Sequence, residues 1–494
     1  MDTSALIIGA GPVGLMLAGE LRLAGIDVTV LESLPRRTGE SRGIGMTIRT
    51  VELFDQRGLL PRLSRHQAGE IQYGNQGHFG GIGLDLGVLG GFHQAAKTVP
   101  QSVTETALEE WARELGADIR RGSEFLSLED DGSGVTVRTR EASGERTLRA
   151  RYVVGCDGGR SRVRKAGGFD FPGTPATTEL LLADLRGADL EPRMVGEQLS
   201  GGMVMVARLP DGAHRVIVAE RDARPQRRTE PPAFAEVADA WKRLTGIDIS
   251  HAEPVWVSAF GDAARLATEY RRGRVLLAGD AAHVHLPAGG QGMNTGLQDA
   301  ANLGWKLAAV LHGTAPAQLL DTYHTERHEV GRRLLENTKA QSLLILGGAD
   351  VGPLRHVLSE LVGNDDVSRH LAAKVSGLDI RYDVGTGSHP LLGMRMPHLP
   401  LDRDGRATSS TELLRSGRGV LLDLEANMRL RQRAEGWADR IDVVTATPHE
   451  VPPGGPLHST AAVLLRPDGH VAWAAPGSHH DLPMALERWF GPSR

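Results

Sequence analysis

The sequence has a single cysteine, Cys156, among 494 residues. One cysteine excludes an intramolecular disulfide and a zinc site built on several thiolates, and no metal site is predicted. Long apolar runs are also missing: no window approaches roughly 18 consecutive apolar residues, the minimum for a membrane-spanning helix. Residues 1–9 lack the positively charged segment of a secretory signal. We therefore expect a cytoplasmic protein that has no membrane partner.

Charge of one sign is not in excess either. The chain has 56 Lys and Arg residues against 61 Asp and Glu residues, with the signs well mixed, and this gives no indication of a nucleic-acid partner. Glycine, in contrast, is abundant: there are 62 glycines, many of them grouped in short loops next to apolar runs. Since glycine lets the backbone approach a ligand closely, this distribution indicates a bound cofactor.

The chain is too long for one compact core, so two or three domains are expected. Strand patterns at residues 5–8 and 27–31 enclose a helical pattern at residues 14–24, which predicts the βαβ unit that opens a doubly wound sheet. Parallel strand and helix patterns return at residues 274–278 and continue to about residue 345. A capping box at residues 102–105 predicts the start of another helix.

Two other patterns of predicted secondary structure follow the parallel strands and helices. From about residue 174 the chain shows short strands and tight turns, with residues 203–206 and 215–218 on either side of a turn at residues 210–212, and this predicts an antiparallel sheet. A stretch rich in Gly, Pro, Ser and Thr at residues 385–418 is interpreted as a linker. Beyond it, strand, helix, strand, hairpin and final helix follow in the order of a thioredoxin-like domain, but without cysteines for redox chemistry.

One glycine motif lies between the first predicted strand and the first predicted helix. Gly9, Gly11, Val13 and Gly14 belong to a G-x-G-x-x-G segment, and Glu32 ends the next strand 18 residues further on. Such glycines let a pyrophosphate reach the N-terminus of a helix, and Glu32 can accept hydrogen bonds from a ribose. A tight turn without a ligand would not explain the acid at that distance. The segment therefore predicts a bound dinucleotide.

Two later segments each follow an apolar strand: Asp157-Gly158, and Gly279-Asp280 with a glycine-rich loop at residues 287–294 behind it. With the first motif, they resemble the G-x-G-x-x-G, D-G and G-D fingerprints of the flavoprotein aromatic hydroxylases, the class A monooxygenases. Order and spacing match across about residues 1–345. The resemblance implies an FAD-dependent aromatic hydroxylase, in which Asp280 binds the ribityl chain and Asp157-Gly158 serves both FAD and the nicotinamide.

The resemblance also implies further contacts and the course of the reaction. Arg42 and Gln101 map onto an arginine and a glutamine near the flavin, although Arg42 could be a surface charge and Gln101 could simply precede a helix cap. FAD would be non-covalent, and NADPH or NADH would visit transiently, because no second G-x-G-x-x-G exists. The reactive group would be the flavin C4a-hydroperoxide, so no catalytic side chain is predicted.

The loop at residues 287–294 has a physical role that its own residues predict. Its glycines let successive backbone N–H groups converge at a helix N-terminus, which favours negative charge. Reduced flavin is anionic, so this loop would stabilise it; a helix cap without a ligand is the alternative. The cofactor contacts predicted here are Pro287, Gly290, Gln291, Gly292, Met293 and Asn294.

A narrower resemblance extends over the whole chain. Residues 38–43, 99–105 and 285–292 look like segments of the aromatic polyketide hydroxylases of angucycline biosynthesis, which act with dioxygen on flat tetracyclic intermediates of antibiotics. The implied α/β fold has a Rossmann-like FAD-binding domain, an antiparallel sheet substrate domain and a C-terminal thioredoxin-like domain. A homodimer is favoured by the family. The implied FAD-binding domain comprises residues 1–173 and 274–345, and the antiparallel sheet domain comprises residues 174–273. A helical and linker segment follows at residues 346–394, and the thioredoxin-like domain comprises residues 395–494.

Five residues are predicted to wall the substrate pocket, although each could be ordinary packing: Tyr73, Asn75, His78, Gln94 and Trp256. Three other functions fit less well. An NAD-only dehydrogenase would not need Gly279-Asp280, and a flavin-dependent halogenase usually carries a W-x-W-x-I-P motif, which is missing here. A non-catalytic binding protein on the same fold, such as a prenyl-GTPase chaperone, would not need the loop at residues 287–294.

Overall fold

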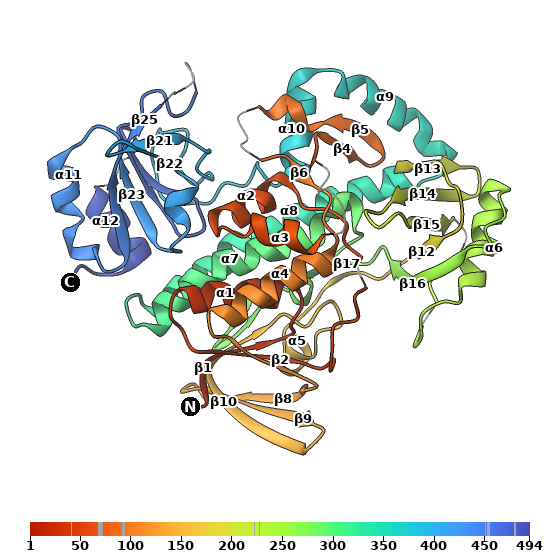
Figure 1. Cartoon of the computed structure of the whole chain (residues 1–494), viewed down its shortest axis with the longest axis horizontal. Helices are drawn as coiled ribbons and strands as arrows, with labels where there is room; N and C mark the ends of the chain where they lie inside the picture. The colour runs from red at the N-terminus through yellow and green to blue at the C-terminus, as the bar shows by residue number, and fades with distance from the viewer. Residues whose placement is uncertain are drawn as a thin grey trace.

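The fold contains a mixed sheet with its helices, an antiparallel sheet at the right of Figure 1 and a C-terminal sheet at the left. None of the helices in the described part of the chain has both the length and the apolar character that crossing a membrane requires. The computed structural model describes residues 1–40, 42–67, 73–90, 94–221, 223–226, 228–449, 451, 455–478 and 481–494.

The mixed sheet has the strand order β18-β19-β10-β1-β2-β7, and β9 and β8 continue from β10 as antiparallel strands. The pairs β10–β19, β1–β10, β1–β2 and β2–β7 are parallel, which confirms the predicted βαβ opening and the returning parallel strand. Both faces of β1 are covered, which explains its uninterrupted apolar run. The strands are β1 (Thr3–Ile8), β2 (Val28–Glu32), β7 (Asp118–Arg121), β8 (Glu124–Asp130), β9 (Val135–Glu141), β10 (Gly144–Gly155), β18 (Arg271–Arg272) and β19 (Val275–Leu277).

Helices cover this sheet and pack closely on one another. α1 (Pro12–Leu23) packs against both α4 (Gln101–Glu114) and α7 (Gln291–Leu311). A Cβ on Gly19 would lie 2.0 Å from the Trp111 ring, so α1 and α4 approach too closely for any larger residue. The other helices of this part are α2 (Ile48–Gln56), α3 (Leu60–His66), α5 (Arg162–Ala166) and α8 (Asp321–Leu346).

The start of α4 corrects one prediction. The capping box expected at residues 102–105 does not form: α4 begins at Gln101, directly after Pro100, and no side chain caps it. The side-chain amide of Gln101 (Nε2) donates instead to Glu105 Oε1 at 2.8 Å. Because proline has a fixed φ and no N–H to satisfy, the chain enters the helix there and Ser102 falls inside the first turn.

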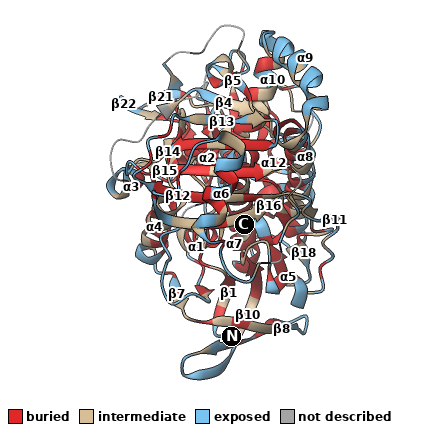
Figure 2. Ribbon diagram, turned by 90° about the vertical axis from the view of Figure 1, so that its right-hand side faces the viewer, coloured by how far each residue is buried: buried red, intermediate tan, exposed pale blue. Residues whose placement is uncertain are grey.

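The antiparallel sheet has the order β13-β14-β15-β12-β16, and its β14–β15 hairpin is the one predicted. Side chains alternate along its strands: Val204 and Val216 pack against α6 (Phe234–Thr245), while the neighbouring Met203 and Arg215 face a cavity on the other side. Figure 2 shows β12, β14 and β15 largely buried. The strands are β12 (Glu179–Arg186), β13 (Arg193–Leu199), β14 (Gly202–Arg208), β15 (His214–Glu220) and β16 (Glu253–Gly261).

Smaller elements close the remaining side of the cavity. β4 (Gln76–Phe79) and β5 (Ile82–Asp85) form a hairpin that packs against α10 (Asp365–Ser376) around Leu84 and Ala372. The other elements in these parts are β3 (Tyr73–Gly74), β6 (Ala96–Lys97), β11 (Gly173–Thr174), β17 (Ala264–Leu266), β20 (His283–Val284) and α9 (Gly352–Val362).

The C-terminal sheet has the order β24-β23-β26-β27. β23 and β24 are parallel, whereas β23–β26 and the β26–β27 hairpin are antiparallel. The predicted order of strand, helix, strand, hairpin and final helix is therefore confirmed. The elements are β23 (Gly419–Asp423), α11 (Met428–Arg433), β24 (Ile441–Thr445), β26 (Ala462–Leu465), β27 (Val471–Ala475) and α12 (Leu482–Phe490).

The prediction that residues 385–418 are a plain linker is wrong. This stretch contains a hairpin of β21 (Pro400–Arg403) and β22 (Arg406–Ser409), and β21 also pairs with β25 (Thr447–Pro448). Leu401 on the hairpin is buried in the main core. The Gly, Pro, Ser and Thr residues form turns around short strands, and composition alone does not distinguish such turns from a free linker.

Candidate functional site

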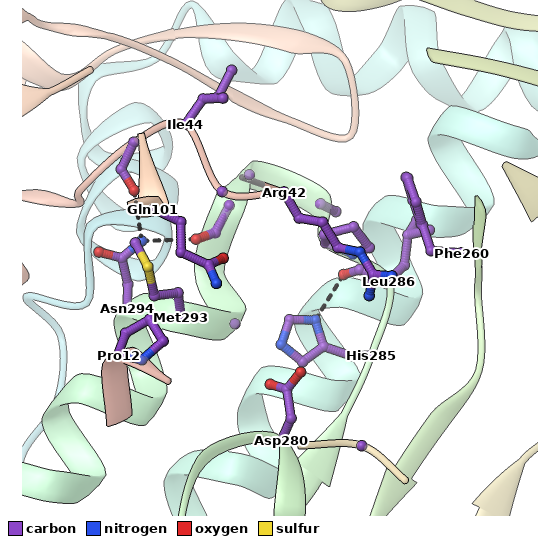
Figure 3. A pocket seen from close by; sticks show the side chains of 18 of the residues that line it. Pro12, Arg42, Ile44, Gln101, Phe260, Asp280, His285, Leu286, Met293 and Asn294 are labelled. Carbon is purple, nitrogen blue, oxygen red and sulfur yellow. Dashed lines mark hydrogen bonds between the residues drawn. The ribbon is translucent and has the colours of Figure 1, made fainter. Parts of the chain in front are cut away.

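A cavity of about 2040 Å³ lies between the mixed sheet, the antiparallel sheet and the β4–β5 hairpin. Figure 3 shows side chains from segments far apart in sequence around its open centre. The glycine motif, the loop at residues 42–47 and the start of α7 meet here. The predicted site residues that line the cavity are Gly9, Gly11, Val13, Glu32, Arg42, His78, Gln101, Asp157, Gly158, Asp280, Pro287, Gly290, Gly292, Met293 and Asn294.

Three predicted cofactor residues lie behind the cavity wall and shape it. A Cβ on Gly14 would lie 2.0 Å from the carbonyl oxygen of Gly9. The Gly279 N–H donates to the buried Asp299 carboxylate at 3.1 Å. The Gln291 amide donates to a carbonyl of its own loop at 3.2 Å. These residues hold the loops that carry the cavity surface.

The glycine motif fits a bound pyrophosphate. A Cβ on Gly9 would lie 2.4 Å from Cys156 O, so protein packing alone requires glycine there. Gly11 differs, because its φ of −78° suits any residue and a Cβ would meet no protein atom within 4 Å. Nothing in the protein requires glycine at this position, whereas a ligand lying against the backbone does. The residues present therefore fit a dinucleotide phosphate at the start of α1.

Glu32 has a role beyond the predicted contact with a ribose. Its carboxylate accepts hydrogen bonds from Ala10 N at 2.9 Å and from Leu34 N at 2.8 Å. It holds the glycine loop against the end of β2, and it also lines the cavity. A substitution of Glu32 would therefore disturb the loop together with any contact to a ligand.

The Asp157 carboxylate is occupied by protein donors. Ser161 Oγ donates to it at 2.5 Å, Arg162 N at 2.6 Å and Val163 N at 3.1 Å, so Asp157 helps the N-cap residue Ser161 to cap the start of α5. The next residue, Gly158, has a φ of +76°, and a Cβ there would meet nothing within 4 Å. The D-G pair thus presents bare backbone to the cavity, supported by the aspartate behind it.

Asp280 projects from the cavity floor, below His285 in Figure 3. Among the residues that the structure describes, none donates a hydrogen bond to its carboxylate, which is open to the cavity. Burial by the surrounding protein raises the pKa of this carboxyl, and His283 and Arg42 oppose the rise. An acceptor in such a place is stabilised when a ligand hydroxyl donates to it, as a ribityl chain would.

The loop at residues 287–294 presents bare N–H groups at the start of α7. Gly289 and Gly290 have φ values of +65° and +66°, and no side chain caps the helix. The first N–H groups of a helix have no partner within it, and the helix dipole favours an anion beside them. This end of the cavity therefore suits a ligand part that carries negative charge.

Asn294 connects the two loops that line the cavity. Its Oδ1 accepts from Thr47 N at 3.0 Å, and its Nδ2 donates to Gly45 O at 3.2 Å and to Gly290 O at 2.8 Å. Figure 3 shows this arrangement beside Met293. With all its hydrogen bonds made within the protein, the Asn294 amide positions the loops for a ligand.

The antiparallel sheet supplies the opposite, largely apolar wall. The apolar residues of the sheet that line the cavity include Leu180, Leu182, Met203, Met205, Ile217 and Phe260. Arg215, on the same face, donates to both oxygens of Asp184 at 2.7 Å and to Arg42 O at 2.8 Å. Its charge is therefore paired, and it fastens the sheet to the loop at residues 42–47.

The residues predicted for the substrate wall fall into different places. His78 lines the cavity, and burial lowers the pKa of its imidazole. Asn75, Gln94 and Trp256 are not among the lining residues. The side chain of Tyr73, in β3, lies outside the part of the chain that the structure describes. Of the four side chains that the structure describes, one, that of His78, lines the cavity.

Many polar residues that line the cavity escaped prediction, among them Lys97, His285 and Ser376. His285 precedes the glycine-rich loop by two residues, so the neighbouring motif was a usable signal. Its Nδ1 donates to Leu286 O at 2.7 Å, and burial lowers the pKa of the ring to about 4. Lys97 and Ser376 come from β6 and the end of α10, and no local pattern marks them.

We expect Gly11→Ala to weaken FAD binding by about 5- to 10-fold, because the new methyl group takes space that the pyrophosphate needs; such an intrusion costs roughly 1 kcal/mol or more. The melting temperature of the apoprotein should not change, since the protein has room for the methyl group. Titration of the apoprotein with FAD, followed by flavin fluorescence, gives the affinity. Gly352→Ala, which also meets open space but lies outside the cavity, is the control. Equal affinities in the two variants would exclude a pyrophosphate at Gly11.

Asp280→Asn should weaken FAD binding by about 10-fold, the difference between a charged and a neutral acceptor. The stability of the apoprotein should not fall, because the carboxylate is open to the cavity and no described residue donates a hydrogen bond to it. Thermal unfolding and FAD titration measure the two effects. Asp321→Asn, at an exposed carboxylate at the start of α8, serves as the control. A loss of apoprotein stability in Asp280→Asn would mean that the carboxylate serves the fold.

Known proteins that resemble this chain agree with the FAD site described above. A family model described as an FAD binding domain matches residues 2–338, and one described as the C-terminal part of aromatic-ring hydroxylases matches residues 389–493. Rifampicin monooxygenase of Streptomyces venezuelae is 43% identical over 98% of this chain and 98% of its own. The crystal structure of CabE, an aromatic hydroxylase from angucycline biosynthesis, is 62% identical with a TM-score of 0.97, and that of BexE, studied for oxidation during BE-7585A biosynthesis, is 69% identical with a TM-score of 0.95; each covers 100% of both chains.

Proposed function

The chain belongs to the aromatic-ring hydroxylases with an FAD-binding domain, and from this premise we propose that its substrate is a flat, angucycline-type aromatic polyketide. It is an FAD-dependent monooxygenase with NAD(P)H as electron donor. Relatives within the family differ in the compounds they are named for, so family membership leaves the substrate open. The similarity to CabE, at 62% identity over the whole chain, supports the angucycline class.

The observation that carries the proposal is one cavity with two unlike walls. A pocket for a single drug-sized ligand has roughly 300–1,000 Å³, whereas this cavity has about 2040 Å³. One wall has the bare glycines, the uncapped helix end and Asp280, which fit FAD. The other wall is apolar and comes from the antiparallel sheet. We assign residues 174–273 to substrate binding on this basis.

The apolar wall suits a large planar ring system. Met203, Met205 and Phe260 offer polarisable and aromatic surfaces, and methionine adapts its shape to the ring it meets. Arg215 contributes no free charge there because Asp184 pairs with it. A flat aromatic substrate would bury its rings on this wall and turn an edge toward the cofactor.

The residues of this chain bind the cofactor and the substrate, orient them, and exclude water from the place where they react. Bound FAD would supply the redox chemistry, taking electrons from NAD(P)H and passing one oxygen atom of O₂ to the ring. The N–H groups at the start of α7 would hold negative charge that appears on the cofactor after reduction. Asn294 keeps these groups and the loop at residues 42–47 in register. The sheet wall keeps the reacting edge of the substrate away from bulk water.

The alternatives named from the sequence are not favoured. A halogenase and a non-catalytic binding protein share the FAD-type fold, but the relatives above are named as a monooxygenase and an aromatic hydroxylase, and BexE was studied for oxidation. We further propose a cytoplasmic homodimer that takes electrons from NADPH or NADH. Light scattering of the purified protein measures its mass in solution, and a monomer would remove the dimer from this proposal.

Substrate class is tested by adding compounds to the holoenzyme and following NADPH oxidation and flavin absorbance. An angucycline-type tetracycle should bind and accelerate NADPH oxidation, while rifampicin, the compound in the name of a 43% identical relative, should do neither. Acceleration by rifampicin alone would replace the proposed substrate class by that of the relative.

A further inference from the structure

Three buried side-chain amides connect the β4–β5 hairpin to the loop before α7. Gly80 N donates to Gln341 Oε1 at 3.1 Å, and Gln341 Nε2 donates to Asn337 Oδ1 at 3.4 Å. Asn337 Nδ2 donates to Gln291 Oε1 at 3.1 Å, and Gln291 Nε2 donates to Ala288 O at 3.2 Å. We call these three side chains, Gln291, Asn337 and Gln341, the amide relay.

Each end of the relay belongs to an element that lines the cavity. Gly80 is in the turn of the β4–β5 hairpin, and strand β4 lines the substrate side. Ala288 lines the cavity within the loop before α7. The glycine after it packs on the relay: a Cβ on Gly289 would lie 3.4 Å from Gln291 Nε2 and 3.9 Å from Gln341 Oε1. The relay therefore bridges the substrate side and the loop beside the reduced cofactor.

The hairpin turn is held against α8 at both of its polar groups. The Gly80 N–H donates to the relay, and the Gly80 carbonyl accepts from Arg355 Nη1 at 2.8 Å. Arg355 Nη1 also donates to Leu344 O at 2.7 Å. A Cβ on Gly80 would lie 2.6 Å from the Leu344 side chain. Asn337 and Gln341 are one turn apart on α8, so they share one face of it. The turn is therefore fixed to this face of α8 by hydrogen bonds and close packing.

The relay is stable only when it is complete. Gln291, Asn337 and Gln341 are 5%, 8% and 0% exposed, and a buried amide that loses a partner is destabilised. The neighbouring apolar cluster, which includes Ile345, needs no such bonds. Gln291 and Asn337 also line a second cavity of about 420 Å³, so packing does not lock them on every side.

We propose that the amide relay is a positioning device that couples contact of the substrate with the β4–β5 hairpin to the placement of the loop before α7. A substrate that presses on the hairpin aligns the N–H groups that face the cofactor, so electrons from NAD(P)H are used mainly when substrate is present. The identity of the substrate rests on the proposed function. The coupling between the two ends does not depend on which polyketide binds.

Hydrogen exchange of the holoenzyme without substrate tests the coupling itself. Gln291→Leu alters only the loop end of the relay, yet exchange should increase by about 5-fold or more both at residues 287–290 and at residues 76–85. Thr338→Val is the matched control, because this buried hydroxyl on α8 bonds only to carbonyls of its own helix, such as Leu334 O at 2.9 Å. Faster exchange confined to residues 287–290 in Gln291→Leu would overturn the proposal.

The amount of product formed per NADPH is a second measurement, and a merely structural role of the relay would not change it. Gln341→Leu and Gln291→Leu should each lower the product formed per NADPH by about 5-fold or more. The double variant should be no worse than either single variant, because both interrupt the same chain of bonds. FAD occupancy of Gln341→Leu should equal that of the wild type.

Additive losses in the double variant would overturn the relay, as would unchanged coupling in Gln341→Leu when the wild-type protein is stimulated. If no polyketide stimulates the wild type, the proposed substrate class has failed, and hydrogen exchange still decides whether the two ends are coupled.

Discussion

Replacement of Gly290 by valine is expected to reduce the product formed per NADPH by about 100-fold at saturating FAD, with hydrogen peroxide released instead. Gly290 has a φ of +66°, a conformation that β-branched residues avoid. Valine would turn the N–H groups at the start of α7 away from the negative charge of the reduced cofactor. One lost donor costs about 100- to 1,000-fold in oxyanion-stabilising sites, and the lower end applies because a flavin spreads its charge.

Gly313→Val is the matched control for this experiment. Gly313 has a φ of +71° and open space around its Cα, as Gly290 has, but it follows the C-terminal end of α7 and does not line the cavity. The backbone strain is the same, so coupling should stay at the wild-type value in Gly313→Val. If Gly290→Val also keeps the wild-type coupling and rate of flavin reduction, the loop is only a helix cap.

Arg466→Met is expected to lower the free energy of unfolding by about 3–5 kcal/mol, the usual effect of removing one partner of a buried ion pair. Arg466 is fully buried in the turn between β26 and β27, and it donates to both oxygens of Glu326 on α8, at 2.6 and 2.8 Å. It also donates to Asp468 at 2.5 Å, while Lys306 donates to Glu326 at 2.8 Å. Without Arg466 these two carboxylates would lose the one cation that donates hydrogen bonds to both of them in the described part of the chain.

The effect of Arg466→Met should depend on pH. Burial opposes the ionisation of Glu326, but Arg466 and Lys306 hold the pKa of its carboxyl at about 2. A pKa lowered in the folded state stabilises the fold above the ordinary value of 4.5, and this stabilisation is lost as the pH falls toward 2. The difference between wild type and variant should therefore be largest near neutral pH and shrink below pH 4.5. Urea unfolding at a series of pH values measures it.

Arg332→Met supplies the comparison on the same helix. Arg332 is 47% exposed and pairs with Glu329 and Glu336, which are also exposed, so its loss should lower the free energy of unfolding far less than the loss of Arg466. Equal losses of unfolding free energy in Arg466→Met and Arg332→Met would show that the buried network stabilises the fold no more than an exposed ion pair does. Removal of residues 395–494 would separate Arg466 from Glu326 as well, and we expect the remaining chain to lose stability for the same reason.

The cofactor side of the cavity was predictable because its signals are local. Gly11 stands between a strand and a helix, Asp280 follows an apolar strand, and Gly290 directly precedes a helix. Parallel strands bring their C-terminal ends to one edge of a sheet, so these separate segments had to meet. No knowledge of side-chain packing was needed to place them around one ligand.

The substrate side could not be predicted in this way. Alternation along β14 and β15 shows that one face is apolar, but only the position of α6 decides which face is left for the cavity. Ser376 reaches the wall from α10, more than a hundred residues after the sheet. Trp256 looked like a ligand-binding aromatic residue, yet it lies beside Arg215, 5.6 Å from its guanidinium.

The hydrogen-bond partners of polar residues could not be predicted where they lie in the fold rather than in the motif. Asp157 follows the fingerprint, but its carboxylate caps α5. Residues 102–105 have the letters of a capping box, but Pro100 starts the helix earlier. A sequence motif states which residues are present, whereas hydrogen-bond partners depend on the path of the backbone.

Isotope labelling tests monooxygenation of an aromatic polyketide most directly. The holoenzyme is supplied with NADPH, an angucycline-type tetracycle and ¹⁸O₂, and the product is identified by mass spectrometry and NMR. We expect one ¹⁸O atom in each hydroxyl group introduced, on a ring carbon, and no label when ¹⁸O is supplied as water. A product labelled from water, or NADPH oxidised at the same rate with and without the tetracycle and no oxygenated product, would contradict the proposed function.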